Sequence, residues 1–587
     1  MASTLAHDLT WDLDSIFPGI ASPQFESALA EFVADSLALA GNISTLTGRD
    51  VAKFDTLAIE LCRVLDNGLL LEGFLDCLLS ADSFAAEPQR AAGRFSLGRA
   101  ELDKAIVAFT AWVGSIDATA LLAISELARE HEYAIAKAQE SARRLMTSEA
   151  EAVSADLAVS GRIAWTKLYG NVTSQIKVRV DGFAEALPVS AVRGLASHAD
   201  ANVRRNAYLA EQAAWKEHSV PIAAALNSIK GASITICRHR GWDSPLDVAL
   251  FNSNIDRATL DAMLGAAEEA FPMLRRYMRV KAKRLGIQKL AFHDLFAPIA
   301  DPGDTWSYGN AESFVAKQFD SFSKRMGDLA REAYSKHWID VLPRAGKRDG
   351  AFCQPVRADE SRIMMNFKPS YNQVSTLAHE LGHAYHNVCL NGRTALQRDT
   401  PMTLAETAST FCEVVVRQAA LDAVGEAEQL AILEAGLQGA TQIVVDISSR
   451  FLFERAVIER RAETELTADD FVELMLDAQR LTYGDGLDPE RMHGYMWAAK
   501  PHYYGSDFYN FPYMFGMLFG LGLYAEYETH PEGFVERYNK LLSRTGMADA
   551  GTLAADFGID LRSKAFWQAS LAQIGKDVDR FCALAEK

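Results

Sequence analysis

The feature that most constrains the fold of this chain is its helical periodicity. Ala, Leu, Glu and Arg dominate long stretches, and apolar residues recur at spacings of three and four. That spacing places them on one face of an α-helix, so we expect a mainly α fold. From Leu29 to about Leu157 the pattern predicts a set of long amphipathic helices. Gly and Pro interrupt it without marking an internal repeat.

The chain is too long for one hydrophobic core. It has 587 residues, whereas single cores stop growing beyond roughly 250–300 residues. We therefore expect two lobes with a boundary near residue 190. The first is an N-terminal helical lobe at 1–190, and the second is a domain at 191–587 that carries the motifs described below.

The charge balance restricts the partners. Hydrophobic residues make up 49% of the chain and charged residues 23%, as in ordinary globular proteins, and the net charge is −18. Such a chain has no summed positive field to neutralise phosphates, which argues against nucleic acid as the main partner. A basic run lies between Leu274 and Leu285, and in this acidic context it favours a solvated helix face.

Three further features predict a cytoplasmic location with no membrane partner. The seven cysteines are scattered without a CxxC pair, which favours a reducing compartment. The stretch from Met1 to Gly19 contains no Lys or Arg, so it does not resemble a secretory signal. The uncharged stretch from Phe508 to Ala525 is interrupted by Pro512 and glycines, which predicts a buried core helix preceded by a loop.

Two short β regions are expected. The residues Ile176 to Val180 alternate in polarity and are followed by Asp181-Gly182, which predicts a hairpin. A second region lies between Gly350 and Phe367, where two short apolar runs are bounded by turn residues and could pair with each other.

The motif that carries chemistry is His379-Glu380-Leu381-Gly382-His383. We expect a helix from about Tyr371 to Leu390, followed by a stop signal at Asn391-Gly392. On such a helix His379 and His383 share one face, so two imidazole nitrogens can meet one metal ion. Glu380 lies one step round the helix, where it could accept a proton from a metal-bound water. Zinc is the usual metal for this HExxH arrangement.

A catalytic zinc ion needs a third protein ligand and an open position for water. The next candidate downstream is Glu406, in the sequence Glu-Thr-Ala-Ser-Thr, 27 residues after His379. That length allows a loop and the start of an antiparallel helix. The alternative is a helix with incidental histidines, and Glu406 favours the metal site over it.

These motifs resemble the oligoendopeptidase F branch of the thimet oligopeptidase family of zinc metallopeptidases. The resemblance rests first on His-Glu-Leu-Gly-His and the later Glu-Thr-Ala-Ser-Thr. It spans nearly the whole chain and is densest from about residue 340 to 525. Further similar segments are Trp11–Leu13, Gly346–Cys353, Pro501–Tyr504 and Phe508–Tyr513.

The resemblance implies a two-lobed, zincin-type metallopeptidase with a deep central channel and a small β region beside the HExxH helix. It implies an endopeptidase that hydrolyses short oligopeptides, because a narrow channel admits an extended peptide and excludes a folded domain. One Zn²⁺ per chain would be held by His379, His383 and Glu406. Glu380 would act as general base and pass the proton to the leaving amine.

By the same resemblance, Tyr509 and Tyr513 are candidates to donate hydrogen bonds to the oxyanion, and His502 to hold substrate or intermediate. Here the chain departs from the thimet oligopeptidase pattern. The gap between His502 and Tyr509 is two residues longer, and a further tyrosine of that pattern falls on Gly516.

Three neighbouring features extend the site. Glu413 follows Glu406 by seven residues, so it could orient a ligand histidine or form a salt bridge to another helix. His386 is expected to be a structural histidine, because a fourth protein ligand would close the open position. The segment Ile363–Phe367 is a hypothetical edge strand that could pair with a peptide backbone.

Two other functions stay open. A metallo-carboxypeptidase that trims peptide C-termini would need a cation for the terminal carboxylate, and the sequence does not identify one. An inactive peptide-binding protein on the same fold would have no need of Glu380. Short peptides are the expected partners in each case, and both monomer and homodimer are compatible with the sequence.

Overall fold

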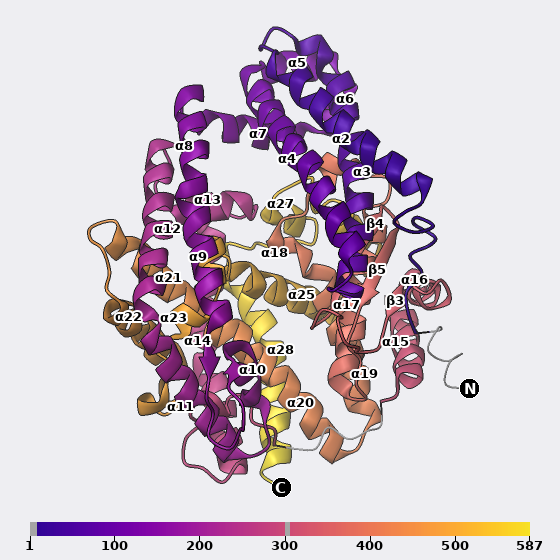
Figure 1. Cartoon of the computed structure of the whole chain (residues 1–587). Coiled ribbons are helices and arrows are strands. Elements are labelled where there is room, and N and C mark those ends of the chain that lie inside the picture. Colours follow the sequence, from indigo (N-terminus) through magenta and orange to yellow (C-terminus); the bar gives the residue numbers. More distant parts are fainter. Residues whose placement is uncertain (1–8, 300–305) are drawn as a thin grey trace. The chain divides into compact units, whose positions relative to one another are not determined.

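The computed structural model describes residues 9–299 and 306–587 (Figure 1). These residues form two compact units, each assembled from three segments of the chain. In the described part, unit 1 comprises 9–144, 306–422 and 526–558, and unit 2 comprises 145–299, 423–525 and 559–587. The first changeover therefore falls at residues 144 and 145, whereas the sequence indicated a boundary near 190. The division into a lobe at 1–190 and a catalytic domain at 191–587 stays a prediction.

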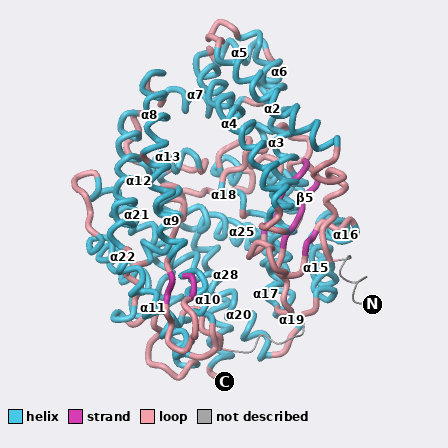
Figure 2. The backbone as a smooth tube through the Cα atoms, in the orientation of Figure 1, coloured by secondary structure: helices cyan, strands magenta, loops and turns pink. Residues whose placement is uncertain are grey.

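Unit 1 is helical around one small sheet (Figure 2). Its helices are α2 (Pro23–Ser44), α3 (Phe54–Ala81), α4 (Ala86–Ser115), α5 (Ala118–Ile124), α6 (Glu126–Glu130), α7 (Glu132–Arg143), α15 (Tyr308–Phe322), α16 (Lys324–Ser335), α17 (Tyr371–Cys389), α18 (Met402–Ala405), α19 (Thr407–Ala423), α26 (Phe534–Leu542) and α27 (Ala550–Ala555). Its strands are β3 (Ile339–Asp340), β4 (Phe352–Arg357) and β5 (Glu360–Met364).

The N-terminal helices of unit 1 confirm the predicted amphipathic pattern. Helix α2 begins with Pro23 after Ser22, whose hydroxyl accepts a hydrogen bond from the backbone N–H of Phe25. Helices α2, α3, α4 and α7 pack together. Their apolar faces form one core, in which the rings of Phe32 and Phe95 stack 5.0 Å apart.

The sheet of unit 1 has the strand order β3-β5-β4. Strand β5 pairs antiparallel with β4, with Phe352 opposite Met364, which confirms the expected pairing in this region. The expectation that Ile363–Phe367 is an edge strand is wrong. A third strand, β3, pairs in parallel with β5, and the backbone N–H of Met365 donates to the carbonyl of Asp340. Strand β3 has only two residues, so no alternating pattern revealed it.

Helices α3 and α17 both pack against this sheet. Gly73 permits the close approach of α3, because a Cβ there would lie 3.0 Å from the carbonyl oxygen of Pro355 in β4. Helix α17, which carries the HExxH motif, contacts both β4 and β5. The β region thus lies beside the HExxH helix, as predicted.

Unit 2 is also mainly helical. Its helices are α8 (Ser148–Ser160), α9 (Arg162–Gln175), α10 (Val189–Gly194), α11 (Ala201–Glu217), α12 (Ser219–His239), α13 (Pro245–Asn252), α14 (Arg257–Arg284), α20 (Glu426–Thr441), α21 (Ile447–Arg461), α22 (Ala468–Tyr483), α23 (Met496–Ala499), α24 (His502–Gly505), α25 (Phe511–Thr529) and α28 (Lys564–Ala585). A π-helical turn, η5 (Gln442–Asp446), joins α20 to α21. Strands β1 (Lys177–Val178) and β2 (Leu187–Pro188) pair antiparallel and confirm the hairpin.

Two helical stretches of unit 2, α12 and Glu426–Arg461, are long and apolar enough to cross a membrane by length and composition alone. The bent pair of α4 and α5 in unit 1 passes the same test. In the fold, α12 and α21 pack together, and the ammonium of Lys230 donates to Glu454 at 2.6 Å with both side chains 1% exposed. The stretch 508–525 forms the loop and most of helix α25, which is largely buried as predicted.

Candidate metal centre

Helix α17 supplies two of the candidate ligands. It runs from Tyr371 to Cys389, close to the predicted bounds, and Gly392 follows with the positive φ of +84° that a turn after a helix favours. Tyr371, Val374, Leu377 and Ala378 are buried on its inner side. His379 and His383 keep only about a quarter of their side-chain surface exposed.

The structure brings His379, His383 and Glu406 together. The Nε2 atoms of the two histidines lie 3.1 Å apart. Oε2 of Glu406 lies 3.4 Å from Nε2 of His379 and 3.5 Å from Nε2 of His383. Among the described residues, this is the group of His, Cys, Asp and Glu side chains whose ligand atoms are arranged to share one metal ion.

These separations fit a zinc ion. Ligand atoms about 2.0–2.1 Å from Zn²⁺ at tetrahedral angles lie about 3.3–3.4 Å from one another. The three observed distances bracket that value. With three protein ligands, the fourth tetrahedral position is left for water or substrate.

Glu413 on α19 fixes the orientation of His379. Its Oε1 lies 2.5 Å from Nδ1 of His379, and its Oε2 accepts a hydrogen bond from the hydroxyl of Ser375. Of the two alternatives for Glu413, the structure shows the contact with a ligand histidine. When Nδ1–H donates a hydrogen bond to this carboxylate, Nε2, which faces His383 and Glu406, keeps its lone pair for a metal ion.

Negative charge dominates this group. Although burial opposes protonation, Glu413, Glu380 and Glu406 together raise the pKa of His379 to about 9. Burial and the neighbouring His379 lower the pKa of His383 to about 4, so the group holds one positive charge among its carboxylates, and a bound cation would meet the same attraction.

Gly382 allows the third ligand to approach. A Cβ at this position would lie 2.6 Å from Cα of Ser409 and 2.8 Å from the carbonyl oxygen of Ala408. Any larger residue would therefore push α19 away from α17. Glu406 is the residue that links α18 to α19, so its distance from the histidines depends on this contact.

Glu380 lies one step round α17 and is 5% exposed. Burial, together with Glu406 and Glu413, raises the pKa of its carboxyl to about 7. A carboxylate with a raised pKa is a better proton acceptor than one in water, which suits a general base. His386, by contrast, is buried with its Nε2 2.9 Å from the hydroxyl of Thr545.

In unit 2, the structure groups the other predicted site residues with one another. The rings of His502 and Tyr509 stack at 5.1 Å, and those of Tyr509 and Tyr513 meet edge-on at 5.5 Å. Burial, Arg450 and Lys500 lower the pKa of His502, so its imidazole is neutral near pH 7. That these three residues act in catalysis stays a prediction.

A buried charge cluster holds the loop within this segment. Lys230 donates to Asp507 at 2.7 Å and to the carbonyl of Ser506 at 3.1 Å. The next residue, Phe508, has a positive φ of +51°, which is costly for an aromatic residue. The sequence showed the longer spacing between His502 and Tyr509, but not the lysine that anchors it, since Lys230 is far away in the chain.

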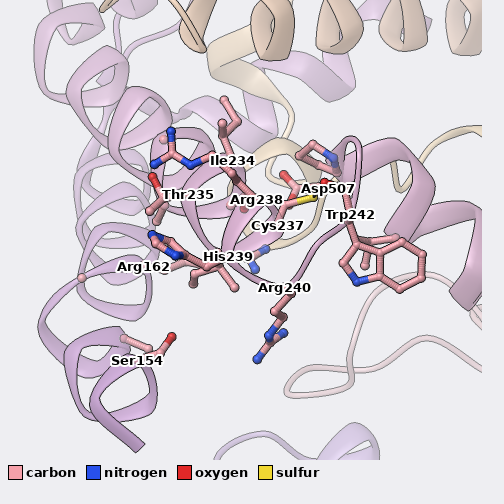
Figure 3. A pocket seen from close by; sticks show the side chains of 18 of the residues that line it. Ser154, Arg162, Ile234, Thr235, Cys237, Arg238, His239, Arg240, Trp242 and Asp507 are labelled. Carbon is pink, nitrogen blue, oxygen red and sulfur yellow. Dashed lines mark hydrogen bonds between the residues drawn. The ribbon is translucent and has the colours of Figure 1, made fainter. Parts of the chain in front are cut away.

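Unit 2 also contains a large pocket that the sequence did not indicate. It has a volume of about 1510 Å³ and is lined mainly by α8, α12 and α13 (Figure 3). Arg162 and Asp507 contribute to it, and the Arg240 guanidinium forms two hydrogen bonds with Glu151 at 3.0 and 2.7 Å. Its size suits a ligand as large as a short peptide.

Comparison with known proteins gives a consistent result. The model of Peptidase family M3 matches residues 195–573. Oligopeptidase PepF of Bacillus subtilis is 24% identical over 389 residues, which cover 66% of this chain and 58% of the relative. An oligoendopeptidase F homolog of Lactococcus lactis is 25% identical over 393 residues, covering 66% of this chain and 64% of the relative. The matched regions thus span about three fifths of these relatives.

Solved structures share the fold. A Chlamydophila abortus structure described as a peptidase superposes with a TM-score of 0.85 over 99% of both chains, at 17% sequence identity. Oligoendopeptidase-F from Enterococcus faecium gives a TM-score of 0.72 at 16% identity, covering 96% of this chain and 99% of that one. These likenesses confirm the mainly α fold class.

Proposed function

Because this chain belongs to peptidase family M3, we propose that it is a zinc-dependent endopeptidase that hydrolyses short oligopeptides. The observation that carries the proposal is the triangle of His379, His383 and Glu406, with separations of 3.1 to 3.5 Å and Glu380 buried next to it. The names of the relatives, oligopeptidase and oligoendopeptidase, support the substrate class.

The residues of α17, of α19 and of the link between α18 and α19 would have the following roles. His379, His383 and Glu406 would hold one Zn²⁺, which when bound lowers the pKa of a water ligand and polarises the scissile carbonyl. Glu380 accepts the proton of the attacking water and gives it to the leaving amine. Glu413 keeps His379 in the tautomer that leaves Nε2 free.

We assign supporting roles to the segment from His502 to Tyr513. The hydroxyls of Tyr509 and Tyr513 would donate hydrogen bonds to the oxyanion, and His502 would hold substrate or intermediate. The mutual ring contacts and the neutral imidazole support this assignment. Removing one oxyanion donor typically lowers kcat by roughly 10²–10³-fold. Tyr513→Phe should therefore lower kcat far more than it raises KM.

The partners we propose are short peptides, in keeping with the names of the relatives. We propose a cytoplasmic location from the scattered cysteines, which favour a reducing compartment. A monomer and a homodimer would both accommodate this function.

The test is hydrolysis of an internally quenched peptide of about ten residues that is blocked at both ends. Four samples are compared: the untreated protein, a chelator-treated sample, a zinc-restored sample and Glu380→Gln. We expect cleavage in the first and third samples only. Zinc content is measured in every sample, since Glu380→Gln should retain the ion and lose only activity, by roughly 10²–10⁴-fold.

Other results would replace the proposal. If only a peptide with a free C-terminus is trimmed, the protein is a metallo-carboxypeptidase. If neither peptide is cleaved while zinc and peptide both bind, the fold serves peptide binding alone. Full activity of Glu380→Gln would show that another group is the base.

A further inference from the structure

A second, much smaller cavity lies inside unit 2. It has a volume of about 70 Å³ and is bordered by α14, α20, the π-helical turn η5 and α21. One buried water needs roughly 10–15 Å³ of such space, so the cavity can hold several waters or one small ion. Four of its lining residues carry the argument that follows: Tyr277, Thr441, Arg450 and Lys500.

Three lining side chains have buried polar atoms without a hydrogen-bond partner. These atoms are the hydroxyls of Tyr277 and Thr441 and Nε of Arg450. Burial and the nearby Glu434 carboxylate raise the pKa of the Tyr277 hydroxyl, so Tyr277 is the donor of the three with an acceptor close by. The three residues are only 2%, 5% and 6% exposed. An unpaired buried polar group is costly, so three around one cavity indicate that something occupies it. All three atoms can donate a proton, which favours an acceptor as the occupant.

The charges around the cavity leave one cation without a partner. Lys281 donates to Glu434 at 2.5 Å, Arg193 lies 3.5 Å from Glu211, and Arg450 is paired with Asp446. In the part of the chain that the structure describes, no carboxylate oxygen lies within 4.0 Å of the Lys500 ammonium. Burial and the neighbouring Arg450 lower the pKa of Lys500 to about 7.

The backbone at this place is also unusual. Residues Gln442–Asp446 form a π-helical turn between two α-helices, and Thr441 and Asp446 lie at its two ends. Such turns widen a helix locally, and they occur frequently at functional sites. Here the turn contributes Gln442 and Asp446 to the wall of the cavity.

We propose that this cavity is a binding site for a small inorganic anion, held by Lys500 together with the unpartnered donors of Tyr277, Thr441 and Arg450. The anion would supply the negative charge that Lys500 lacks and the acceptor that the three buried donors lack. The proposal does not depend on peptide hydrolysis, although Arg450 and Lys500 also lower the pKa of the neighbouring His502.

The competing occupant is water. Oε2 of Glu434 is also buried without a partner, and a water molecule could bridge such an acceptor to a nearby donor. Water would satisfy the hydroxyls, but it would leave the charge of Lys500 unbalanced. An anion should therefore bind more weakly when the charge of Lys500 is removed, whereas water should not, and this difference can be measured.

The experiment uses the full chain and two probes. Crystals are soaked in sodium bromide, and an anomalous bromine peak is sought in the cavity. Crystals in phosphate test an oxyanion at the same place. In solution, the melting temperature is followed as chloride or phosphate replaces gluconate at constant ionic strength, which yields a Kd for each anion.

Three variants sharpen the result. Lys500→Met removes the unbalanced cation and should weaken anion binding at least tenfold. Tyr277→Phe removes one donor and should weaken binding severalfold while keeping the ring. Arg279→Met is the matched control, since Arg279 lies on α14 but is 47% exposed and pairs with Asp485. Its Kd should stay within twofold of the wild-type value.

Density for bromide or phosphate in the cavity, with weaker binding in Lys500→Met, would establish the site and show which type of anion it takes. Water density under both conditions, with no anion-specific change in melting temperature up to 100 mM, would overturn the proposal. So would equal binding by Lys500→Met and the wild type. If Lys500→Met does not fold, the bromide soak and Tyr277→Phe still decide.

Discussion

The candidate metal centre and the segment from His502 to Tyr513 are proposed to serve one reaction, yet they are held in different ways. In the metal centre, two candidate ligands lie four residues apart on α17, and the third, Glu406, lies between α18 and α19. In the other segment, a four-residue helix leads into a loop with a left-handed Phe508 before α25 begins. That loop is anchored by a lysine that comes from α12.

The difference lies in what fixes each geometry. Helix periodicity and one close contact at Gly382 are sufficient to place the candidate metal ligands. The loop instead depends on a fully buried ammonium between two carboxylates, which is stable only while all three groups are present. The geometry of the metal centre should therefore survive the loss of a charge in the Lys230 cluster, whereas the loop from His502 to Tyr513 should not.

The largest effect is expected from Lys230→Met. Burial opposes the charge of Lys230, but Asp507 and Glu454 outweigh it and raise its pKa above the usual value. Removing one partner of a buried ion pair costs about 3–5 kcal/mol, because the remaining charges stay buried without compensation. We expect this loss in the free energy of unfolding by urea, and a lower kcat because the His502–Tyr513 segment loosens.

Zinc affinity is the discriminating measurement for that variant, and it should be unchanged. A matched control is Lys324→Met, since Lys324 is 82% exposed in its pair with Asp328. It should change stability by less than about 1 kcal/mol. If Lys230→Met lost zinc while its stability stayed intact, the two regions would not be independently held.

The converse change is Gly382→Ala, which should disturb the metal centre. The added methyl would meet the backbone of Ser409 at 2.6 Å, and such overpacking costs typically about 1–3 kcal/mol. Because α19 must shift, we expect zinc affinity to fall at least tenfold as well. Affinity is measured by competition with a chromogenic chelator, and unfolding by urea.

Gly93→Ala is the control for that substitution. Gly93 lies within α4, and a Cβ there would meet no atom within 4 Å. Alanine is favoured over glycine inside helices by about 0.5–1 kcal/mol, so this variant should be slightly more stable. An equal loss of zinc in both variants would count against the role of the close contact.

The same contrast explains what could be predicted from the sequence. The fold class, helix α17, the hairpin and the pairing of β4 with β5 follow from local periodicity and turn residues, which need no knowledge of distant contacts. The pair His379 and His383 could be predicted because spacing along a helix translates directly into spacing in space, whereas Glu406 was only the next candidate downstream.

What could not be predicted depends on distant parts of the chain. Strand β3 is too short to show a pattern, so the sequence predicts an edge strand at Ile363–Phe367, where the structure has a strand paired on both sides. Lys230 stands 276 residues before Ser506, and no local signal connects them. The basic run on α14 predicts a solvated face, but Lys281 within it is fully buried against Glu434, which lies on α20.

A smaller effect is expected from Glu413→Gln. The amide keeps the shape of the side chain but can no longer act as a charged acceptor for Nδ1 of His379. Substitutions of this kind typically lower metal affinity by about 10–100-fold. Ser375→Ala should do less, because it removes only the hydroxyl that supports Glu413. Unaltered affinity in Glu413→Gln would show that α17 alone orients His379.

The smallest effect is expected from a substitution of Lys500, whose ammonium lies next to the segment from His502 to Tyr513. The pKa of Lys500 is lowered from its usual value near 10.5 to about 7 in the folded chain, so between these values the unfolded chain binds more protons. Stability due to this group therefore rises with pH from 7 to 10.5, and the full penalty applies below pH 7. Lys500→Met should consequently be more stable than the wild type at pH 6.5, by about 1 kcal/mol once solvent screening of this half-buried group is considered.

That advantage should shrink towards pH 10, and chloride or phosphate should remove it at pH 6.5, because a bound anion stabilises only the wild-type ammonium. Urea unfolding of both proteins in gluconate and in chloride measures the difference. The metal centre serves as the internal reference, since zinc affinity should be the same in both proteins. If the free energies of unfolding of Lys500→Met and the wild type differed by the same amount at every pH, the folded chain would compensate the charge of Lys500. Lys500 would then be paired in the same way as Lys230.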